Sequence, residues 1–445
     1  VGVTFKLWAV ISAKQYSPAA LDLEHKVAWI VSEQQRHGFL FDVAQAEKLL
    51  MHLQKERAEI EADLQTIFDP WYSAIEVKTP KRTVNYKSVT RASVTAGCPY
   101  TVVKLNVFNP NSRLHISDRL ISKYGWEPQD FTPDGRPKVD ETVLSNLPYP
   151  EAQAIAKSLM IQKRIGQLGE GKNAWLALVE DDNRIHGSIN TNGAVTGRMT
   201  HMFPNVAQTP SVGKPYGKEC RMLFKVPKGK KLVGVDVSGL ELRMLGHFLA
   251  AFDDGAYGYE VVNGDIHTVN MKAAGLPDRS AAKRFIYGFL YGAGAAKIGE
   301  VIGKGPKQGA QLKNKFLDQT PALAQLINKV TRASKRGYLK GLDGRILHSR
   351  SAHSSLNLLL QSAGALVCKQ WAVEMDKALI ANNLKHKCQV VANIHDEHQY
   401  ECDEDVAEQV GLLSIEAIKE AGRHFNLKVE LDGEANIGTN WYETH

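Results

Sequence analysis

The sequence predicts a mixed α/β fold in which strands alternate with long helices. Residues 230–237 and 388–401 form short apolar runs rich in β-branched residues, as buried strands do. Apolar residues recur with a helical period over 279–291 and 353–382. Strands so far apart in the chain are expected to meet in one α/β core with helical attachments.

Length, charge and cysteine content restrict the class of protein. A chain of 445 residues can form a large core with several subdomains. Its 55 Lys and Arg against 48 Asp and Glu give a formal net charge of +7, which is compatible with a polyanionic partner. Five scattered cysteines lack metal-ligand spacing and suggest reduced thiols of a cytosolic protein. No apolar stretch reaches the roughly 18 residues of a membrane span.

The first elements are expected to be helical. Apolar stripes over 21–66, interrupted at 38–42, predict two helices. From about 68 to 107 the helical period is lost and Lys and Arg exceed the acids, which indicates an extended basic insertion, either a solvated loop or a binding surface. Helical pattern returns near 150–180, and turn formers with β-branched residues over 184–198 predict a hairpin.

The later elements alternate between strand and helix. The strand at 230–237 is followed by a predicted helix over 238–251. A lysine-rich helical region continues after the 279–291 helix to about residue 337, and a turn follows at 341–345. The last expected elements are the long helix over 353–382, two strands within 388–401, and a closing helix and strand.

Two aspartates, Asp236 and Asp396, lie in or beside the apolar strand-like runs. Such carboxylates would repel each other if the fold brought them together, unless a cation lay between them. Mg²⁺ takes oxygen ligands of this kind with substrate phosphates, so we expect a two-ion Mg²⁺ site, with the carbonyl of Val237 as a further ligand. Glu397 is a weaker candidate ligand, because it would point the other way if 394–400 is a strand. Alternatively, each aspartate caps a neighbouring helix or turn.

The 279–291 helix carries a cationic and aromatic face. Arg279, Lys283, Tyr287 and Tyr291 recur at every fourth residue. Two cations suit phosphate oxygens and a tyrosine ring suits a sugar and base, so this face is expected to bind a nucleoside triphosphate. The opposite, apolar face indicates ordinary helix packing as well. His267 precedes the helix and either adds a donor to the triphosphate or is structural.

Three long polar side chains, Arg198, Asn357 and Gln361, lie on predicted elements. Asn357 and Gln361 are four residues apart on the long helix and share a face. Donors of this kind suit sequence-independent readout of minor-groove acceptors. A hydrogen-bond network in the core is the alternative.

Several segments match one known family. Residues 236–243 resemble motif A of the family A, or Pol I-like, DNA polymerases; residues 279–294 resemble motif B, and His395-Asp396-Glu397 resembles motif C. Their order and spacing agree with the family, within which the phage replicative enzymes are most similar. The resemblance extends from about Leu23 to the last residue and includes residues 108–113, 162–167, 193–198 and 359–364.

The resemblance implies a right-hand polymerase fold of thumb, palm and fingers, with an antiparallel palm sheet covered by helices. The expected parts are an N-terminal remnant at 1–20, a thumb at 21–175 containing the basic insertion, a palm at 176–262 and 341–445, and fingers at 263–340.

The resemblance also assigns roles to individual residues. Asp236 and Asp396 would hold Mg²⁺, with Glu397 in the same catalytic motif. Glu241 would be a steric gate that excludes a ribose 2′-hydroxyl, and Gly239, two residues earlier, would also bind the nucleotide. The other implied nucleotide-binding residues are Arg279, Lys283 and His267 at the triphosphate, Tyr287 at the sugar and Tyr291 at the templating position. The implied DNA-binding residues are Arg198, Asn357 and Gln361 at the minor groove, His395 at the primer end, and Lys163 and Arg164.

The sequence also departs from the family pattern. Residues 1–20 supply no acidic motifs of the proofreading exonuclease, so we expect either a fragment or a polymerase whose exonuclease is a separate protein. The insertion at 68–107 lies where a phage relative binds thioredoxin but is shorter, which makes thioredoxin doubtful and leaves another processivity factor as the expected partner. A replicative helicase–primase is a further expected partner.

The expected activity is DNA-templated extension of a primer 3′ end with dNTPs, in the cytoplasm of an infected bacterium if the gene is phage-encoded. One alternative is a single-subunit RNA polymerase, which shares both aspartates but should leave the space of Glu241 open. The other is a non-catalytic primer-template binding protein, which the intact carboxylates, Lys283 and Tyr287 argue against.

Overall fold

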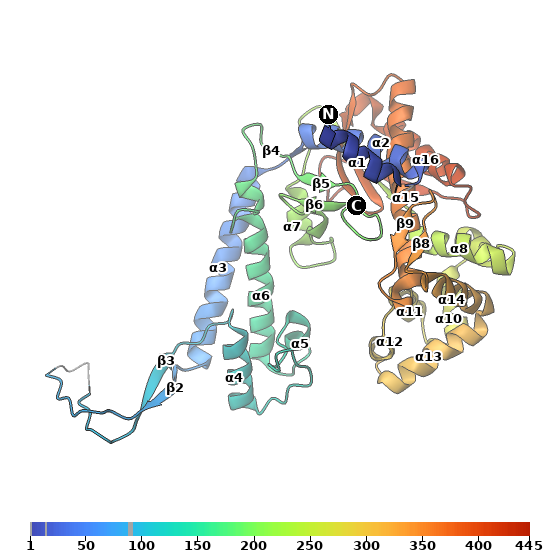
Figure 1. Cartoon of the computed structure of the whole chain (residues 1–445). Helices are drawn as coiled ribbons and strands as arrows, with labels where there is room; N and C mark the ends of the chain where they lie inside the picture. Colours follow the sequence, from blue (N-terminus) through green and yellow to red (C-terminus); the bar gives the residue numbers. More distant parts are fainter. Residues whose placement is uncertain (1, 14–15, 88–91) are drawn as a thin grey trace. The chain divides into compact units, whose positions relative to one another are not determined.

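The computed structural model describes residues 2–13, 16–87 and 92–445 (Figure 1). The chain divides into two compact units. The smaller unit is Ala44–Ala177, and the larger unit joins Val1–Val43 to Leu178–His445. Each unit contains its own cluster of buried apolar side chains, as separate domains do.

The smaller unit is built around two long helices, α3 and α6, which lie side by side (Figure 1). Its core includes Leu64, Leu120 and Ile155, and the rings of Phe68 and Phe108 lie 4.5 Å apart beside them. Its elements are α3 (Val43–Ile67), β2 (Trp71–Lys78), β3 (Tyr100–Asn106), α4 (Arg113–Tyr124), α5 (Glu141–Ser145), α6 (Pro150–Leu168) and the 3-10 helix η1 (Trp175–Ala177).

Strands β2 and β3 form an antiparallel ribbon that leaves most of its side chains exposed. The pairing runs from Trp71 opposite Asn106 to Lys78 opposite Tyr100, with an irregularity between Ala74 and Glu76. The insertion predicted at 68–107 therefore has the extended structure expected of it. Residues 88–91 of this insertion lie outside the described residues.

The larger unit contains a four-stranded antiparallel sheet in the order β10–β11–β7–β12. Strand β7 is buried from Leu232 to Val235, which explains the apolar sequence of that stretch. Every residue of β11 except its last is also buried, although most of its side chains are polar. The β11–β7 pairing runs from Glu397 opposite Asp236 to Asp403 opposite Lys230. The strands are β7 (Lys230–Val237), β10 (Cys388–Ile394), β11 (Glu397–Asp403) and β12 (Gly433–Gly438).

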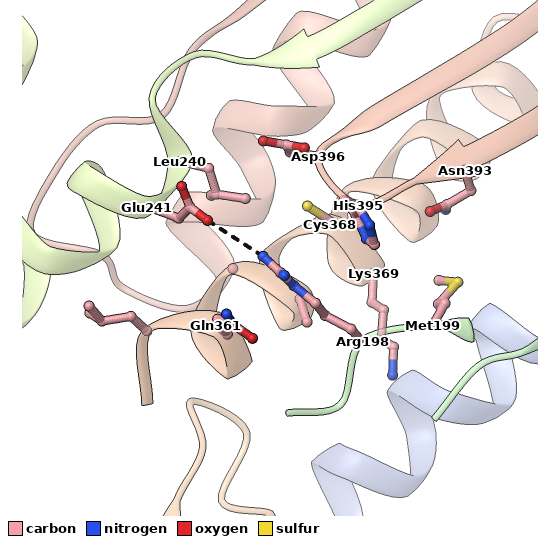
Figure 2. Close-up of a pocket in the computed structure, with 13 residues that line it drawn as sticks. Arg198, Met199, Leu240, Glu241, Gln361, Cys368, Lys369, Asn393, His395 and Asp396 are labelled. Atoms are coloured by element: carbon pink, nitrogen blue, oxygen red, sulfur yellow. Dashed lines mark ion pairs between the residues drawn. The ribbon is translucent and has the colours of Figure 1, made fainter. Parts of the chain in front are cut away.

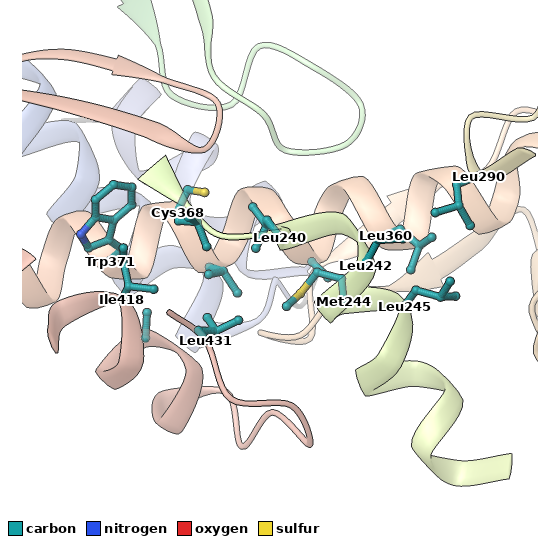
Figure 3. Close-up of a cluster of buried hydrophobic side chains, with 14 of the residues drawn as sticks. Leu240, Leu242, Met244, Leu245, Leu290, Leu360, Cys368, Trp371, Ile418 and Leu431 are labelled. Atoms are coloured by element: carbon teal, nitrogen blue, oxygen red, sulfur yellow. The ribbon is translucent and has the colours of Figure 1, made fainter. Parts of the chain in front are cut away.

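Helix α15 is the central helix of this unit and is buried along most of its length (Figure 3). An almost uniformly apolar helix needs neighbours on all sides, and α15 contacts α2, α8, α14 and α16. Its Trp371 stacks on His398 of β11 at 3.6 Å between ring centroids and donates a 3.1 Å hydrogen bond to Ser414 of α16. The bounds are α2 (Pro18–His37), α8 (Leu240–Asp253), α15 (Ser355–Ala381) and α16 (Ala407–His424).

A group of helices separates α8 from α15. Asp278 caps α11 by accepting a 2.7 Å hydrogen bond from the backbone N–H of Ala281. The apolar face of α11 packs Phe285 and Phe289 against Phe316 of α13, with ring centroids 5.1 and 5.5 Å apart. The helices are α9 (Ala256–Asn263), α10 (Ile266–Ala274), α11 (Arg279–Leu290), α12 (Ala295–Val301), α13 (Pro306–Gln319) and α14 (Pro321–Ser334).

Short elements complete the larger unit. Besides the main sheet, the larger unit contains three separate two-stranded antiparallel sheets, β1–β4, β5–β6 and β8–β9. The elements are α1 (Gly2–Ala13), β1 (Phe39–Leu40), β4 (Arg184–Ile185), β5 (Ser188–Asn190), β6 (Thr200–Met202), η2 (Val206–Gln208), α7 (Gly217–Met222), β8 (Tyr338–Lys340), β9 (Ile346–His348), η3 (Ala352–Ser354) and η4 (Glu404–Val406).

Most predicted elements are confirmed, including the strand at 230–237 and the helices at 238–251, 279–291 and 353–382. The two strands predicted within 388–401 are confirmed as β10 and β11. The condition that 394–400 is a strand, used in the prediction for Glu397, is not met, because a two-residue turn separates Ile394 from Glu397. The helix expected over 150–180 ends at Leu168, where Gly169 follows. Short helices such as α5 and α7 were not anticipated, because one or two turns give little periodic signal.

The packing of Phe285 and Phe289 against Phe316 predicts which substitution most destabilises this group of helices. Phe316 is completely buried, so Phe316→Ala should lower the free energy of unfolding by about 3–5 kcal/mol through lost burial and a residual cavity. Chemical denaturation followed by circular dichroism measures this change. The control is Phe131→Ala, which removes a ring that is 58% exposed and should cost less than about 1 kcal/mol. Equal losses in the two variants would contradict the assigned packing.

Candidate active site

The sheet brings Asp236 and Asp396 to the same end of its two central strands, β7 and β11. Asp236 is the second-last residue of β7, and Asp396 lies in the turn between β10 and β11. The backbone N–H of Val237 donates a 3.0 Å hydrogen bond to the carbonyl of Asp396, which joins the two segments directly. The pairing of β11 with β7 therefore fixes two carboxylates that are distant in the sequence.

The turn that carries Asp396 has an unusual backbone. His395 has a φ of 58°, in the left-handed region required by a two-residue hairpin turn. This conformation presents His395 and Asp396 at the tip of the hairpin (Figure 2). Burial and the nearby Arg198 lower the pKa of His395, so its ring is neutral near pH 7.

The charged form of Asp236 is destabilised by its surroundings. Asp236 is open to solvent, yet the surrounding protein removes much of its hydration. This desolvation, followed by repulsion from Asp396 and then Glu397, raises the pKa of Asp236 to about 7. A divalent cation would reverse this effect, because it favours the ionised carboxylate. The charge state of Asp236 therefore fits a cation site.

The donor set suits a hard cation that shares its coordination with a substrate. In residues 2–13, 16–87 and 92–445, no group of three or more His, Cys, Asp or Glu is arranged to hold a metal. Two carboxylates and the carbonyl of Val237 would supply part of a coordination sphere, and water and phosphates would supply the rest. This division of ligands is typical of Mg²⁺.

Glu397 is held by other protein groups. Burial alone would raise the pKa of Glu397, but the hydrogen bond and charge of His445 and the hydrogen bonds from Gln399 and Trp441 keep it below its usual value. His445 Nδ1 lies 3.1 Å and Gln399 Nε2 2.7 Å from its carboxylate, and the indole of Trp441 donates to it. The guanidinium of Arg221 is 3.9 Å away. These contacts, rather than strand alternation, explain why Glu397 is a poor candidate ligand.

The exposed face of α11 has the predicted composition. Arg279 and Lys283 are exposed, and Tyr287 is half-buried. Arg279 Nε donates to both carboxylate oxygens of Asp265 at 3.2 and 2.9 Å, and these bonds, with one from Thr268, hold the pKa of Asp265 well below its usual range. The cation nearest the start of the helix is therefore already paired.

His267 lies against the same face. Its ring centroid is 6.4 Å from that of Tyr287, and its Nδ1 is buried without a hydrogen-bond partner among the described residues. Burial, followed by the charges of Arg279 and Lys283, lowers the pKa of His267. A neutral imidazole with an unsatisfied nitrogen, adjacent to two cations, fits an anionic ligand better than a closed core position.

Glu241 links several predicted residues. It lies in the first turn of α8, after Gly239, whose φ of 59° is left-handed. The hydroxyl of Tyr291 donates to Glu241, and Arg198 Nη2 lies 3.6 Å from its Oε1 (Figure 2). Burial, then Glu241 and Asp396, raise the pKa of the Tyr287 phenol. The gate candidate and the aromatic face therefore share one site with the carboxylates.

A cavity is lined by residues from four segments of the chain. Arg198, Glu241, Gln361, His395 and Asp396 all line it, with Cys368 and Lys369 of α15 (Figure 2). Of the other predicted DNA-binding residues, Asn357 is half-buried on α15 and does not line the cavity. Lys163 and Arg164 belong to α6 of the smaller unit, where Lys163 is exposed and Arg164 is buried.

Sequence reasoning missed several residues of the site. Lys369 is almost fully buried and pairs with Glu24 of α2 at 2.5 Å, and Glu24 also pairs with Arg345 at 2.7 Å. A lysine within a long apolar helix was a signal that could have identified it. Trp441 and Arg221 gave no comparable signal, because their contact with Glu397 depends on the folded chain.

Comparison with known proteins identifies the family of the chain. The model of "DNA polymerase family A" matches residues 88–443. The chain is 43% identical to the DNA-directed DNA polymerases of Enterobacteria phage T3 and of Escherichia phage T7, over 96% of this chain and 70% of each relative. It is 28% identical to DNA polymerase I of Pseudomonas aeruginosa, over 76% of this chain and 39% of that one.

A solved structure shares the fold. The POL domain of Pol1 from M. smegmatis, in complex with DNA primer-template and dNTP, matches with a TM-score of 0.75 and 19% identity, over 95% of this chain and 70% of that one. The predicted right-hand polymerase fold is confirmed by this likeness. The chain belongs to DNA polymerase family A. Its enzyme class is that of a DNA-directed DNA polymerase.

Members of this family generally use divalent metal ions. In the part of the chain that the structure describes, no helix combines the length and apolar character needed to cross a membrane.

The raised pKa of Asp236 predicts a pH-dependent stability without metal. An unfolded aspartate ionises near pH 4, whereas folded Asp236 resists ionisation up to about pH 7. Stability is therefore lost as pH rises from 4 to 7 and stays reduced above 7. In EDTA at pH 8, Asp236→Asn should be more stable than the parent by about 1–2 kcal/mol, a figure discounted for solvent screening.

Thermal unfolding at pH 4 and at pH 8 measures this effect. The gain should vanish at pH 4, and Mg²⁺ should stabilise the parent but not the variant. Asp254→Asn removes an exposed carboxylate elsewhere and serves as the control. An Asp236→Asn variant that is no more stable than the parent at pH 8 would contradict the repulsion.

Proposed function

We propose that this polymerase extends a primer 3′ end with dNTPs by a two-metal mechanism in which Asp236 and Asp396 hold Mg²⁺. The observation that carries the proposal is the pair of carboxylates fixed by the β11–β7 pairing, with the pKa of Asp236 raised by burial and by Asp396. The carbonyl of Val237 is the proposed third ligand. Two bound Mg²⁺ ions would supply charge neutralisation at the attacking and leaving oxygens.

In this proposal, Glu397 has a positioning role. Its carboxylate is held by Trp441, Gln399 and His445, and it faces Asp236 across the β11–β7 pair. Its negative charge contributes to the raised pKa of Asp236 and so increases the preference of the site for a cation.

The α11 face is the proposed triphosphate site. Lys283 offers a free ammonium, and Arg279 would exchange its two hydrogen bonds to Asp265 for phosphate oxygens. His267 would donate through a ring nitrogen to the same anion, which would satisfy a group that otherwise has no partner among the described residues.

The sugar and the templating base would lie at the other end of this face. Glu241, next to Gly239, is the proposed steric gate against a 2′-hydroxyl, with Tyr287 at the sugar. Tyr291 donates to Glu241 and is the proposed neighbour of the templating position. This arrangement supports dNTP over rNTP use and disfavours the RNA polymerase alternative.

Primer-template DNA is the proposed macromolecular substrate. Arg198 and Gln361 would donate to minor-groove acceptors and His395 would contact the primer end, since all three line the cavity that contains Asp396. Asn357 is proposed to contribute from the same helix as Gln361. Lys163 and Arg164, on α6 of the smaller unit, are proposed to act on the DNA backbone.

We retain the predicted domain boundaries as proposals: an N-terminal segment at 1–20, thumb at 21–175, palm at 176–262 and 341–445, and fingers at 263–340. The exposed ribbon of β2 and β3 is the proposed site of a processivity factor other than thioredoxin. A separate exonuclease and a helicase–primase are the other proposed partners. The cytoplasm of an infected bacterium is the proposed location.

The proposed activity is tested by primer extension with Mg²⁺. Asp236→Asn and Asp396→Asn should each reduce extension at least about 10³-fold, because each removes a charged ligand, and primer-template binding measured by anisotropy should change less than about threefold. Asp432→Asn, which removes an exposed carboxylate from the loop before β12, is the matched control and should retain activity. Full activity in both active-site variants would refute the assignment, and an inactive parent that binds DNA would favour the non-catalytic alternative.

The gate role of Glu241 is tested by sugar selection. Glu241→Ala should increase rNTP incorporation relative to dNTP by at least about tenfold, because the side chain that fills the 2′-hydroxyl space is removed. Single-nucleotide incorporation kinetics with dCTP and CTP measure the ratio. Efficient rNTP use by the unmutated protein would instead support the RNA polymerase alternative. The same assay with mispaired primers should show extension without removal of the 3′ nucleotide by these 445 residues.

A further inference from the structure

Asp265 is an acid among the cationic and polar side chains of the proposed triphosphate site. It is the N-cap residue of α10, where its carboxylate accepts hydrogen bonds from the backbone N–H groups of His267 at 3.2 Å and Thr268 at 3.4 Å. The hydroxyl of Thr268 donates a third hydrogen bond of 2.7 Å. These local bonds fix the carboxylate at the start of α10 without a contribution from any other element.

The same carboxylate holds Arg279 of α11 through the Nε group of the guanidinium, which donates to both carboxylate oxygens. In the described part of the chain, neither terminal Nη group of Arg279 has a hydrogen-bond partner. Lys283, one turn further along α11, is exposed and forms no ion pair with a described acid. Asp265 therefore neutralises the first cation of the α11 face and leaves the second available.

The ion pair between Asp265 and Arg279 is weak enough to be exchanged. Their side chains are 44% and 60% exposed, respectively. Water and salt screen such a pair, which changes an equilibrium by up to about fivefold. The pair is nevertheless charged throughout the neutral range, because the hydrogen bonds from Arg279 and Thr268 hold the pKa of Asp265 well below its usual range. The contact is thus persistent in the free protein and replaceable by a ligand.

A bound triphosphate and Asp265 would compete for one guanidinium. Both are anions, and like charges repel at the short separation that a shared guanidinium imposes. The carboxylate is fixed by the cap of its own helix, so it cannot retreat when a phosphate approaches. Contact between Arg279 and phosphate is therefore favoured when Nε leaves Asp265, and the same competition acts in reverse when the phosphate departs.

We propose that Asp265 is a positioning residue that withdraws Arg279 from phosphate oxygens and so promotes release of the pyrophosphate product. This inference rests on the proposed triphosphate role of Arg279. Asp265 holds the guanidinium before nucleotide binds and recaptures it once primer extension has converted the triphosphate to pyrophosphate. The recapture weakens the binding of dNTP and of pyrophosphate alike, because both present phosphate oxygens to the same cation. Weaker uniform binding raises turnover where product release limits it.

Asp265→Asn tests the proposal in the full chain, because asparagine caps a helix about as well as aspartate but carries no charge. Single-nucleotide primer extension gives the KM for dNTP, and product inhibition by added sodium pyrophosphate gives the Ki. Both constants should fall about two- to fivefold in the variant, because Arg279 is no longer withdrawn, and kcat should stay the same or fall. Thermal melting confirms that the variant remains folded.

Two controls separate the ion pair from a general effect of charge. Asp318→Asn makes the same substitution at an exposed carboxylate of α13 that has no side-chain hydrogen bond or ion pair among the described residues. It should change neither constant by more than about 1.5-fold. Arg279→Ala should raise both constants, and in that background Asp265→Asn should have no further effect beyond about 1.5-fold, because the residue through which it acts is gone.

Three results would overturn the role of Asp265. Higher KM and Ki in Asp265→Asn would mean that Asp265 orients Arg279 for phosphate rather than withdrawing it. An equal fall of both constants in the Arg279→Ala background would reduce the effect to net charge. Unchanged constants in Asp265→Asn, with raised constants in Arg279→Ala, would refute the role of Asp265 alone. Unchanged constants in Arg279→Ala would instead refute the proposed triphosphate role of Arg279 and, with it, that of Asp265.

Discussion

The candidate site depends on one constraint, which is that the sheet holds the carboxylates of Asp236 and Asp396 together although they repel each other. Desolvation and this repulsion raise the pKa of Asp236 to about 7, so the site is destabilised while it holds no cation. The β11–β7 pairing and the hydrogen bond from Val237 to Asp396 keep the two acids together despite that cost. A functional site often lowers the stability of the folded protein in return for activity, and the destabilised charge of Asp236 is an example of this trade-off.

The groups around the carboxylates already have internal partners. Arg279 is paired with Asp265, and Glu241 is held between Tyr291 and Arg198. If nucleotide binds as proposed, these contacts are exchanged for contacts with phosphate and sugar. A ligand that replaced them poorly would leave charged groups unsatisfied, which offers a physical basis for discrimination between nucleotides.

The helices that pack behind the candidate site form a largely apolar core around α15. Helix α15 is buried between α2, α8 and α16, and stacking of Trp371 on His398 ties it to β11, the strand that begins at Glu397. Its single buried cation, Lys369, pairs with Glu24 of α2. Such a helix places Gln361 at the cavity on a support that resists local opening.

The sequence by itself determined the long elements and the family motifs that contain Asp236 and Asp396. Helical period over 279–291 and β-branched runs at 230–237 have strong local signals, and the motifs around Asp236 and Asp396 are recognisable without coordinates. Short elements such as α5 and α7 were missed, because one or two turns carry little periodicity. Two strands were expected within 388–401, but the turn between them, with its left-handed backbone at His395, was not located from the sequence.

Only the tertiary structure decided which residues meet. It revealed that Trp441 and His445 hold Glu397, and that Arg198 and Tyr291 converge on Glu241. Contacts between residues distant in the chain depend on strand register and helix packing, which local sequence patterns do not encode.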